Sequence, residues 1–258
     1  MALDPVCMAT AIDAVLAAGA IHRAHYARKI HIEKKGAIDL VTEVDLASEA
    51  CVRALIGERF PDHAILAEEG DGEAGRQRRP DGYCWVLDPL DGTTNFAHGL
   101  PMFAVSLGLE YDGTAVFGAV YDALREELFT AERGGGAFLN GERLRVSDAG
   151  SLIEGLLCTG FPYDVHTRTD DLVQLFGRFL RRARAVRRLG AAALDLCYVA
   201  AGRLDGFWEA HLKPWDTSAG ALIVSEAGGV VTTWTGEPYQ SREPGLVATN
   251  GRLHDEML

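Results

Sequence analysis

The chain contains 258 residues, of which 48% are hydrophobic and 24% are charged, and this composition excludes a largely disordered protein. A net charge of -12 disfavours a general nucleic-acid-binding protein, because such proteins are usually basic. No apolar run reaches the roughly 20 residues that a membrane-spanning helix needs, and the N-terminus lacks the basic and apolar regions of a secretory signal. We therefore expect a cytoplasmic protein with no membrane or nucleic-acid partner.

The N-terminal part of the chain is predicted to contain two amphipathic helices followed by an antiparallel sheet. Apolar side chains recur at helical spacing over residues 3–30 and 43–58, and the basic run Lys34-Lys35-Gly36 between them indicates a flexible loop. From 103 to 147, four strand-like stretches are separated by Asp-Gly, Gly-Gly-Gly and Asn-Gly turns. This pattern predicts antiparallel strands joined by tight turns.

Beyond about residue 150, helix-like and strand-like segments alternate. The predicted helices cover residues near 167–184, 191–202 and 217–228, and the strand-like segments are 156–161, 185–189, 207–212, 230–234 and 245–250. The alternation indicates a second α/β layer set stacked on the first. No low-complexity linker separates the two parts, so we expect residues 1–148 and 149–258 to form two closely packed halves.

The cysteines and histidines do not form a recognisable metal or disulfide pattern. There are five cysteines, without a CxxC pair: Cys7, Cys51, Cys84, Cys158 and Cys197. Their odd number and wide spacing predict free, mostly buried thiols in a reducing compartment. His63 and His98 have no second histidine or cysteine at a metal-ligand spacing, so we expect both on the surface or in loops.

Two further patterns are interpreted without a function. The stretch GDGEAG at residues 70–75 has the glycine spacing of a dinucleotide-binding turn, but RQRRPDGY after it lacks the apolar period of the required helix, so we predict a mobile polar loop. Arginines between 178 and 188 form a basic cluster, which on an acidic protein favours a solvated helix face over a phosphate site. The role of Arg188 stays open, because this residue lies just before Gly190 and is also a candidate for shaping the site.

The most informative stretch is WVLDPLDGTTNF, residues 85–96. An apolar, strand-like run ends in Asp88 and Asp91, which are followed at once by Gly92 and Thr93. A strand that leads into a Gly-Thr-Thr turn presents free backbone N–H groups where a helix begins, and such groups attract phosphate. Two aspartates at this place would repel a phosphate unless divalent cations lie between the carboxylates and the phosphate.

Two other acidic positions complement these aspartates. Glu68, next to Glu69, follows the apolar run AILA, and Asp216 opens a predicted helix in PWDTSAG. Taken singly, Glu68 is more often a loop residue and Asp216 an N-cap. Taken together with Asp88 and Asp91, they form a set of oxygen-only ligands, which predicts magnesium rather than zinc or copper.

Five segments together resemble the inositol monophosphatase family, in the family's order and spacing. They are DLVTEVD at 39–45, AEEG at 67–70, WVLDPLDGTTNFAHGLP at 85–101, GAAALDLCYVAAGRLDGFWE at 190–209 and PWDTSAGALIVSEAGG at 214–229. The resemblance covers nearly the whole chain and implies an α/β (α+β) fold, the layered αβαβα sugar-phosphatase sandwich, usually a homodimer. It also implies that residues 1–148 carry most metal ligands and that residues 149–258 complete the active site.

The resemblance further implies roles for single residues. The implied metal shell consists of Glu68, Asp88, the carbonyl group of Leu90, Asp91 and Asp216. The implied catalytic residues are Asp45 and Thr93, which orient and deprotonate the attacking water, together with Glu68. The implied phosphate contacts are the N–H groups of Gly92 and Thr93, and the implied contacts to the alcohol portion of the substrate are Asp91, Gly190, Ala192, Glu209 and Asp216. Lys34 is implied to lie on a lid loop over the metals.

The implied activity is the lithium-sensitive, magnesium-dependent hydrolysis of inositol 1-phosphate by a metal-activated water. The alternative function is that of another phosphatase of the same superfamily, with fructose 1,6-bisphosphate, histidinol phosphate or a nucleotide 3′,5′-bisphosphate as substrate. The TNF ending at 94–96 and Glu209 favour inositol phosphate, although Glu209 also fits a strand-end residue paired with an arginine. A catalytically silent metal-binding protein is the alternative from another class, and the intact Asp45 and Thr93 disfavour it.

Overall fold

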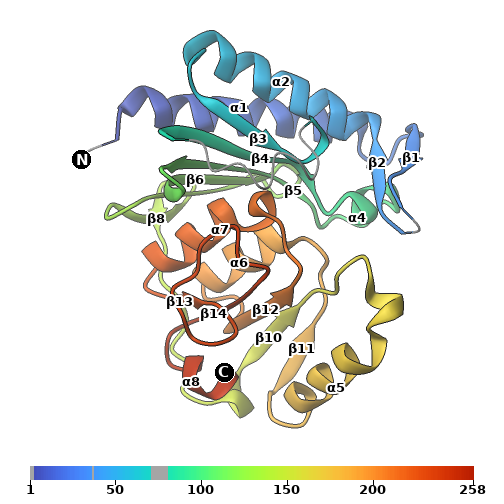
Figure 1. The fold of residues 1–258 in the computed structure, drawn as a ribbon, viewed down its shortest axis with the longest axis vertical. Helices are drawn as coiled ribbons and strands as arrows, with labels where there is room; N and C mark the ends of the chain where they lie inside the picture. Colours follow the sequence, from blue (N-terminus) through green and yellow to red (C-terminus); the bar gives the residue numbers. More distant parts are fainter. Residues whose placement is uncertain (1–2, 37, 71–80) are drawn as a thin grey trace.

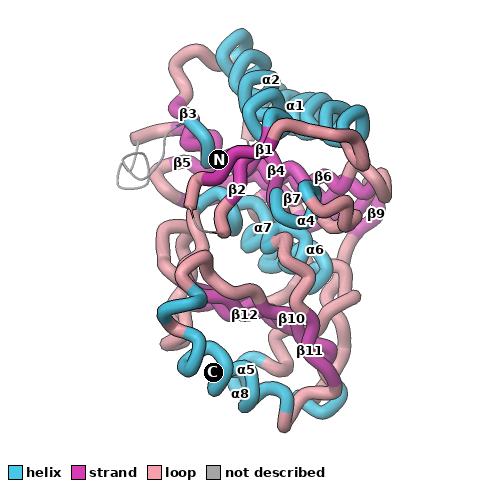
Figure 2. The backbone as a smooth tube through the Cα atoms, turned by 90° about the vertical axis from the view of Figure 1, so that its right-hand side faces the viewer, coloured by secondary structure: helices cyan, strands magenta, loops and turns pink. Residues whose placement is uncertain are grey.

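The computed structural model describes residues 3–36, 38–70 and 81–258. Its elements form five stacked layers in the order helix, sheet, helix, sheet, helix (Figure 1), and Figure 2 shows the same order from the side. The helical layers consist, from one end to the other, of α1 (Pro5–His25) with α2 (Glu43–Arg59), α6 (Ala192–Ala200) with α7 (Pro214–Glu226), and α5 (Thr169–Leu180) with α8 (His254–Met257). The predicted αβαβα sandwich is confirmed.

The first sheet has seven strands among the described residues, in the order β3-β4-β5-β6-β7-β8-β9. β3 and β4 are parallel, and all other neighbours are antiparallel. The strands are β3 (Ala64–Ala67), β4 (Tyr83–Asp91), β5 (Ala104–Tyr111), β6 (Thr114–Asp122), β7 (Glu127–Glu132), β8 (Gly136–Leu139) and β9 (Glu142–Arg143). The antiparallel strands predicted over 103–147 correspond to β5 through β9.

The second sheet has five strands among the described residues, in the order β11-β10-β12-β14-β13. β10 is parallel to both β11 and β12, whereas β14 is antiparallel to both β12 and β13. The strands are β10 (Leu156–Thr159), β11 (Ala185–Arg187), β12 (Gly206–Ala210), β13 (Val230–Thr232) and β14 (Gly245–Thr249). Two short 3-10 turns, η1 (Leu152–Glu154) and η2 (Val165–Thr167), precede β10 and α5. Each strand-like segment predicted beyond residue 150 corresponds to one of these strands.

Helix α7 packs directly on the first sheet because two glycines leave room for it. A Cβ atom on Gly118 of β6 would lie 2.9 Å from the Cα of Ala219, and one on Gly108 of β5 would lie 2.5 Å from the Oγ of Ser218. Real Cβ atoms do not come so close, so a larger residue at Gly118 would push the backbone of α7 away. α7 belongs to the predicted C-terminal half but covers the sheet of the N-terminal half. The division of the chain between residues 148 and 149 therefore stays a prediction.

Helix α1 buries one face against the first sheet. Asp4 caps its N-terminus by accepting a hydrogen bond from the N–H of Val6. The buried residues recur at helical spacing and are Cys7, Thr10, Ala11, Ala14, Val15, Ala18, Gly19 and His22. By length and composition alone α1 would also suit a membrane span, and no second helix of the described residues does. Its apolar side chains share one core cluster with Trp85 and Leu107 of the sheet, which identifies α1 as a core helix.

Several local predictions need correction. The helix expected over 3–30 ends at His25, because the following turn takes Ala27 to a φ of 58°, which a helix does not accept. The loop expected over Lys34-Lys35-Gly36 is wrong at Lys34, which pairs with Leu40 in a hairpin of β1 (Ile32–Lys34) and β2 (Leu40–Thr42), whereas Lys35 and Gly36 lie outside both strands. The GDGEAG stretch lies outside the described residues from position 71 onward.

The remaining polar predictions are mostly confirmed. All five cysteines are free thiols, and only Cys51 among them is not fully buried. The arginines between 178 and 188 are exposed, as a solvated face requires. His98 is exposed, but His63 is half-buried in its loop, where its ring stacks on Phe60 and Tyr83.

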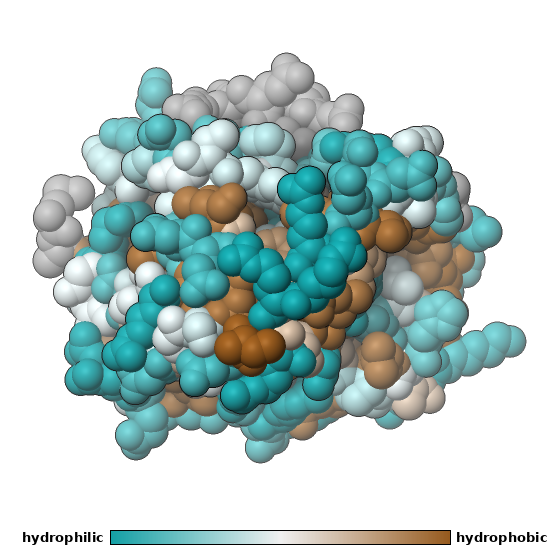
Figure 3. Space-filling view, turned by 90° about the horizontal axis from the view of Figure 1, so that it is seen from below, coloured by the Kyte–Doolittle hydropathy of each residue, from teal (hydrophilic) through white to brown (hydrophobic). Residues whose placement is uncertain are grey.

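The end of the molecule that carries α5 and α8 has a hydrophilic surface interrupted by apolar patches (Figure 3). Four exposed apolar side chains belong to η1, α5 and the C-terminus: Ile153, Val173, Leu180 and Leu258. Isolated exposed apolar side chains are ordinary, whereas several on one end of a molecule favour contact with another protein surface.

Candidate active site

Strand β4 delivers two aspartates to one edge of the first sheet. The strand is buried from Cys84 to Asp91, and its pairing with β5 is irregular between Asp88 and Asp91. In this turn the N–H of Leu90 donates to Oδ1 of Asp88 at 3.0 Å. Gly92, with a φ of 89° that favours glycine, then leads into the short helix α4 (Thr93–Ala97). The helix start predicted after the Gly-Thr-Thr turn is therefore present.

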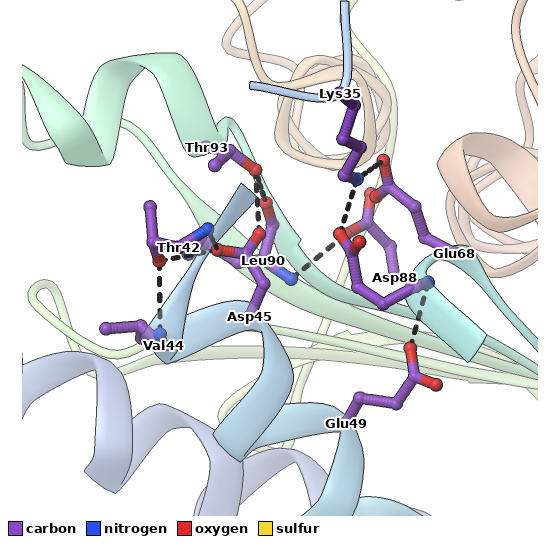
Figure 4. A network of polar contacts seen from close by, with 10 residues as sticks. Lys35, Thr42, Val44, Asp45, Glu49, Glu68, Asp88, Leu90 and Thr93 are labelled. Carbon is purple, nitrogen blue, oxygen red and sulfur yellow. Dashed lines mark hydrogen bonds and ion pairs between the residues drawn. The ribbon is translucent and has the colours of Figure 1, made fainter. Parts of the chain in front are cut away.

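Asp45 and Thr93 form a buried hydrogen-bonded pair, although they are far apart in the sequence. Asp45 is the third residue of α2, and its Oδ2 accepts hydrogen bonds from the N–H and the Oγ1 of Thr42, at 2.8 and 2.6 Å. This capping box leaves Oδ1 of Asp45 free to accept the hydroxyl of Thr93 at 2.9 Å (Figure 4). Burial raises the pKa of Asp45, whereas the hydrogen bonds from Thr42 and Thr93 oppose that rise.

Four predicted metal ligands come together from three segments of the chain. Glu68 follows β3, Asp88 and Asp91 end β4, and Asp216 lies in the first turn of α7. Burial is the largest cause that raises their pKa values, to about 7 for Asp91 and about 8 for Asp216. The pKa values of Glu68 and Asp88 are also raised by burial, and at Asp88 the charges of the other three carboxylates add to the rise. The folded chain therefore holds a group of carboxylates that repel one another.

The cation that lies against this group is Lys35 and not the predicted Lys34. The Nζ of Lys35 donates to Oε1 of Glu68 at 2.9 Å and to Oε1 of Glu69 at 2.5 Å, and Figure 4 shows the side chain pointing toward Glu68. Burial alone would lower the pKa of Lys35, but the two glutamates raise it above its ordinary value. Lys34 is exposed at the end of β1. Side chains alternate along a strand, so the next residue is the one that reaches the carboxylates.

The donor chemistry of the group fits magnesium. All donors are oxygens, and carboxylates whose pKa values are raised by burial and by one another gain stability from a cation placed between them. Within residues 3–36, 38–70 and 81–258, no three acidic, histidine or cysteine side chains already stand at the spacing that holds an ion. In this arrangement Lys35 neutralises Glu68 at a distance of 2.9 Å.

Predicted substrate contacts at the start of α6 are tied to the aspartates of β4. The N–H groups of Ala192 and Ala193 donate to Oδ1 and Oδ2 of Asp91, at 3.0 and 2.8 Å. Nδ2 of Asn95 donates to the carbonyl oxygen of Gly190 at 3.2 Å, and the φ of Gly190 is 84°. The structure thus places Ala192 against Asp91 and Gly190 against Asn95, and the contact of both residues with the substrate stays a prediction.

Glu209 lies near the end of β12, with its carboxylate over Gly160. A Cβ atom on Gly160 would overlap the carboxylate, so a larger residue there would displace the side chain of Glu209. Burial raises the pKa of Glu209 well above its ordinary value, Asp195 and Asp216 raise it further, and the charge of Arg188 opposes the rise. Within the described residues Glu209 makes no ion pair with an arginine, so no direct contact supports the alternative of an arginine-paired strand end.

The sequence analysis missed His22, which contacts the turn between the two aspartates. His22 has no exposed surface, and its Nε2 lies 2.8 Å from the carbonyl oxygen of Pro89. The sequence contains one signal for it: His22 continues the otherwise apolar, buried face of α1 at helical spacing after Val15 and Ala18. A histidine at such a position needs a hydrogen-bond partner in the interior.

A cavity of about 530 Å³ lies apart from the carboxylates, between α5 and the end of β12. Its apolar lining includes Leu172, Leu175, Trp234 and Pro244, and none of the predicted site residues lines it. We assign the cavity no part in the chemistry of the site.

Comparisons with known proteins agree with this architecture. The model of the inositol monophosphatase family matches residues 4–258. The inositol-1-monophosphatase of Synechocystis sp. is 46% identical over 248 residues, which are 96% of this chain and 85% of that protein. Nus factor SuhB of Pseudomonas aeruginosa is 47% identical over 231 residues, 89% of this chain and 85% of that protein. The solved structure of inositol monophosphatase from Anabaena (Nostoc) sp. has a TM-score of 0.86 and 40% identity, and the match covers 98% of this chain and 93% of that chain.

Proposed function

The chain belongs to the inositol monophosphatase family and is a phosphatase, and we propose that it hydrolyses inositol 1-phosphate to inositol and phosphate with the help of magnesium. The observation that supports this proposal most is the group of four carboxylates next to the hydroxyl of Thr93, of which Asp88 and Asp91 are buried and Glu68 and Asp216 are half-buried. A phosphate monoester is anionic and would be repelled by these carboxylates. Substrate and carboxylates are compatible when divalent cations lie between them.

We propose that the carboxylates of Glu68, Asp88, Asp91 and Asp216 and the carbonyl group of Leu90 hold the magnesium. When bound, magnesium supplies charge neutralisation to the phosphate and lowers the pKa of a water molecule. The N–H groups of Gly92 and Thr93 open helix α4, and the first N–H groups of a helix have no partner within it. These groups are therefore proposed to bind a phosphate oxygen.

The pair of Asp45 and Thr93 is proposed to handle the attacking water. The Thr93 hydroxyl lies 2.9 Å from Oδ1 of Asp45 and 2.9 Å from the carbonyl oxygen of Leu90, and it has one proton to donate to either acceptor. Its oxygen can in turn accept a hydrogen bond from water. As the water attacks phosphorus, its proton passes through the Thr93 hydroxyl to Asp45, the bond between phosphorus and the inositol oxygen breaks, and the departing oxygen takes a proton from solvent. Burial raises the pKa of Asp45 and makes it a stronger base than an exposed aspartate.

Glu209 is proposed to select the alcohol portion of the substrate. Its carboxylate makes no hydrogen bond within the described residues and lies close enough to Asp216 for their charges to interact. A carboxylate accepts hydrogen bonds from hydroxyl groups, whereas it repels a second phosphate. This favours a polyol monophosphate over a bisphosphate.

Chelation and a panel of phosphate esters test the proposal together. Activity on inositol 1-phosphate is expected to disappear in chelator and to return with magnesium but not with calcium, which prefers longer bonds and more ligands. Full activity in chelator would exclude the metal mechanism. The highest kcat/KM among inositol 1-phosphate, fructose 1,6-bisphosphate, histidinol phosphate and a nucleotide 3′,5′-bisphosphate identifies the substrate branch. Magnesium binding without turnover of any ester would instead support the silent metal-binding protein.

We further propose that the protein is a cytoplasmic homodimer and that lithium inhibits it. The exposed apolar side chains on η1, α5 and the C-terminus provide a surface that a second copy would cover. Light scattering behind size-exclusion chromatography measures the mass in solution, and a mass equal to one chain at micromolar concentration would exclude the dimer.

A further inference from the structure

The peptide group between Pro89 and Leu90 is buried without support from the sheet. β4 pairs with β5 at Asp88 and again at Asp91, but the two residues between them have no register partner. Proline has no N–H, and its carbonyl oxygen is a buried acceptor that needs a donor. The donor must therefore come from outside the sheet.

His22 of α1 is that donor. Its Nε2 lies 2.8 Å from the carbonyl oxygen of Pro89, and because a carbonyl oxygen only accepts, Nε2 carries the proton. The Nδ1 atom has no hydrogen-bond partner in the described part of the chain. The rings of Phe96 and Phe103 approach the imidazole edge-on, with centroids 6.2 and 5.9 Å away. Burial lowers the pKa of His22 to about 4, so the ring is neutral at pH 7 and has one N–H to donate.

One planar peptide unit links His22 to a predicted metal ligand. The carbonyl oxygen of Pro89 and the N–H of Leu90 belong to the same peptide group and point in opposite directions. His22 holds the oxygen end, and the N–H end donates to Oδ1 of Asp88 at 3.0 Å. The carbonyl group of Leu90 belongs to the next peptide group and is separated from this unit only by the two backbone dihedrals of Leu90, so a shift of the unit displaces it. Hydrogen bonds in such a chain polarise one another in the buried interior.

We propose that His22 is a positioning residue of the metal site: through the Pro89–Leu90 peptide it sets the orientation of the Asp88 carboxylate and of the Leu90 carbonyl group. The inference rests on the proposed function, in which these two groups hold magnesium. His22 touches neither substrate nor metal, and partners of this kind typically change metal affinity when they are replaced.

The test compares two replacements of His22 with a control on the same helix. His22→Leu fills the space between Phe96 and Phe103 but cannot donate, whereas His22→Gln keeps an N–H that can reach the Pro89 carbonyl. Val15→Ala, at another buried position of α1, removes core contacts without touching the turn. If His22→Leu does not fold, His22→Met takes its place, because the flexible side chain adapts to the cavity and also lacks a donor.

The readout is the dissociation constant of magnesium and of manganese for the metal-free protein, measured by calorimetry with thermal unfolding of every variant. We expect the affinity to fall about 10- to 100-fold in His22→Leu, to stay within about threefold of the wild type in His22→Gln, and to be unchanged in Val15→Ala. Wild-type affinity in a folded His22→Leu would overturn the proposal. Equal losses in His22→Leu, His22→Gln and Val15→Ala would also overturn it, because they would report general destabilisation. A wild-type protein that binds neither metal would refute the proposed function itself.

Discussion

Replacing Asp91 with asparagine tests the role of charge in the buried carboxylate group with little change of shape. The two oxygens of Asp91 accept one N–H each, from Ala192 and Ala193. Asparagine has a single side-chain oxygen, so its NH2 group must face one of these N–H donors. The unpaired donor costs about 1–3 kcal/mol of folding free energy. Weaker repulsion of Glu68 offsets part of this cost, so we expect Asp91→Asn to remain folded.

The effect on turnover is expected to be much larger than the effect on stability. Asp91→Asn removes one full negative charge from the proposed magnesium shell, and we expect kcat to fall roughly a hundredfold or more, the scale observed when a key electrostatic group is deleted. Asp122→Asn is the matched control, since Asp122 is also a buried carboxylate but pairs with Arg125 outside the site. This control is expected to lose some stability and to keep its kcat.

The assay is the steady-state hydrolysis of inositol 1-phosphate over a magnesium titration, with thermal unfolding of each variant. Measuring kcat at saturating magnesium separates lost turnover from weakened metal binding. A wild-type kcat in Asp91→Asn would refute the reasoning. An equal loss of kcat in Asp91→Asn and Asp122→Asn would show that the loss follows from lower stability and not from the missing charge.

Three other changes test the site separately. Thr93→Ala is expected to lower kcat by roughly a hundredfold with little change in magnesium affinity, and the exposed Thr94→Ala is its control; equal rates in both variants would exclude the water-handling role. Glu209→Ala is expected to lower kcat/KM for inositol 1-phosphate by about 1.5–3 kcal/mol and to leave nitrophenyl phosphate unaffected, whereas equal losses on both esters would indicate a structural role. Without metal, stability in urea is expected to fall as the pH rises from about 4 to 8, because Asp91 and Asp216, with pKa values of about 7 and about 8, hold protons there that the unfolded chain has released. Magnesium should remove this slope, and a stability that rises with pH in chelator would contradict the pKa values.

The elements that could be predicted from the sequence are those with a repeated local signal. The helix expected over 43–58 forms as α2, and its start coincides with the capping box of Thr42 and Asp45. β5 and β6 are separated at Asp112 and Gly113, whose φ values of 48° and 78° match the predicted tight turn. β1 and β2 have only three residues each, which is too short for a period to be visible.

Site residues were predictable where they share one short stretch and not where the contact is distant. Asp88 and Asp91 lie three positions apart, so their common edge follows from the strand that carries them. Lys35 reaches Glu68 across 33 positions and His22 reaches Pro89 across 67, and neither contact has a local pattern. The pairing of Asp45 with Thr93, 48 positions apart, was expected only from the resemblance to a family.

The packing of α7 on Gly108 and Gly118 also affects how the chain folds as it leaves the ribosome. α7 is synthesised about a hundred residues after β6, so the emerging first sheet has no cover from α7 on this face during that interval. An uncovered apolar face favours aggregation or chaperone binding. Asp216 arrives with α7, so the four carboxylates assemble only when the sheet is covered. The proposed magnesium site is therefore complete only after α7 has packed on the sheet.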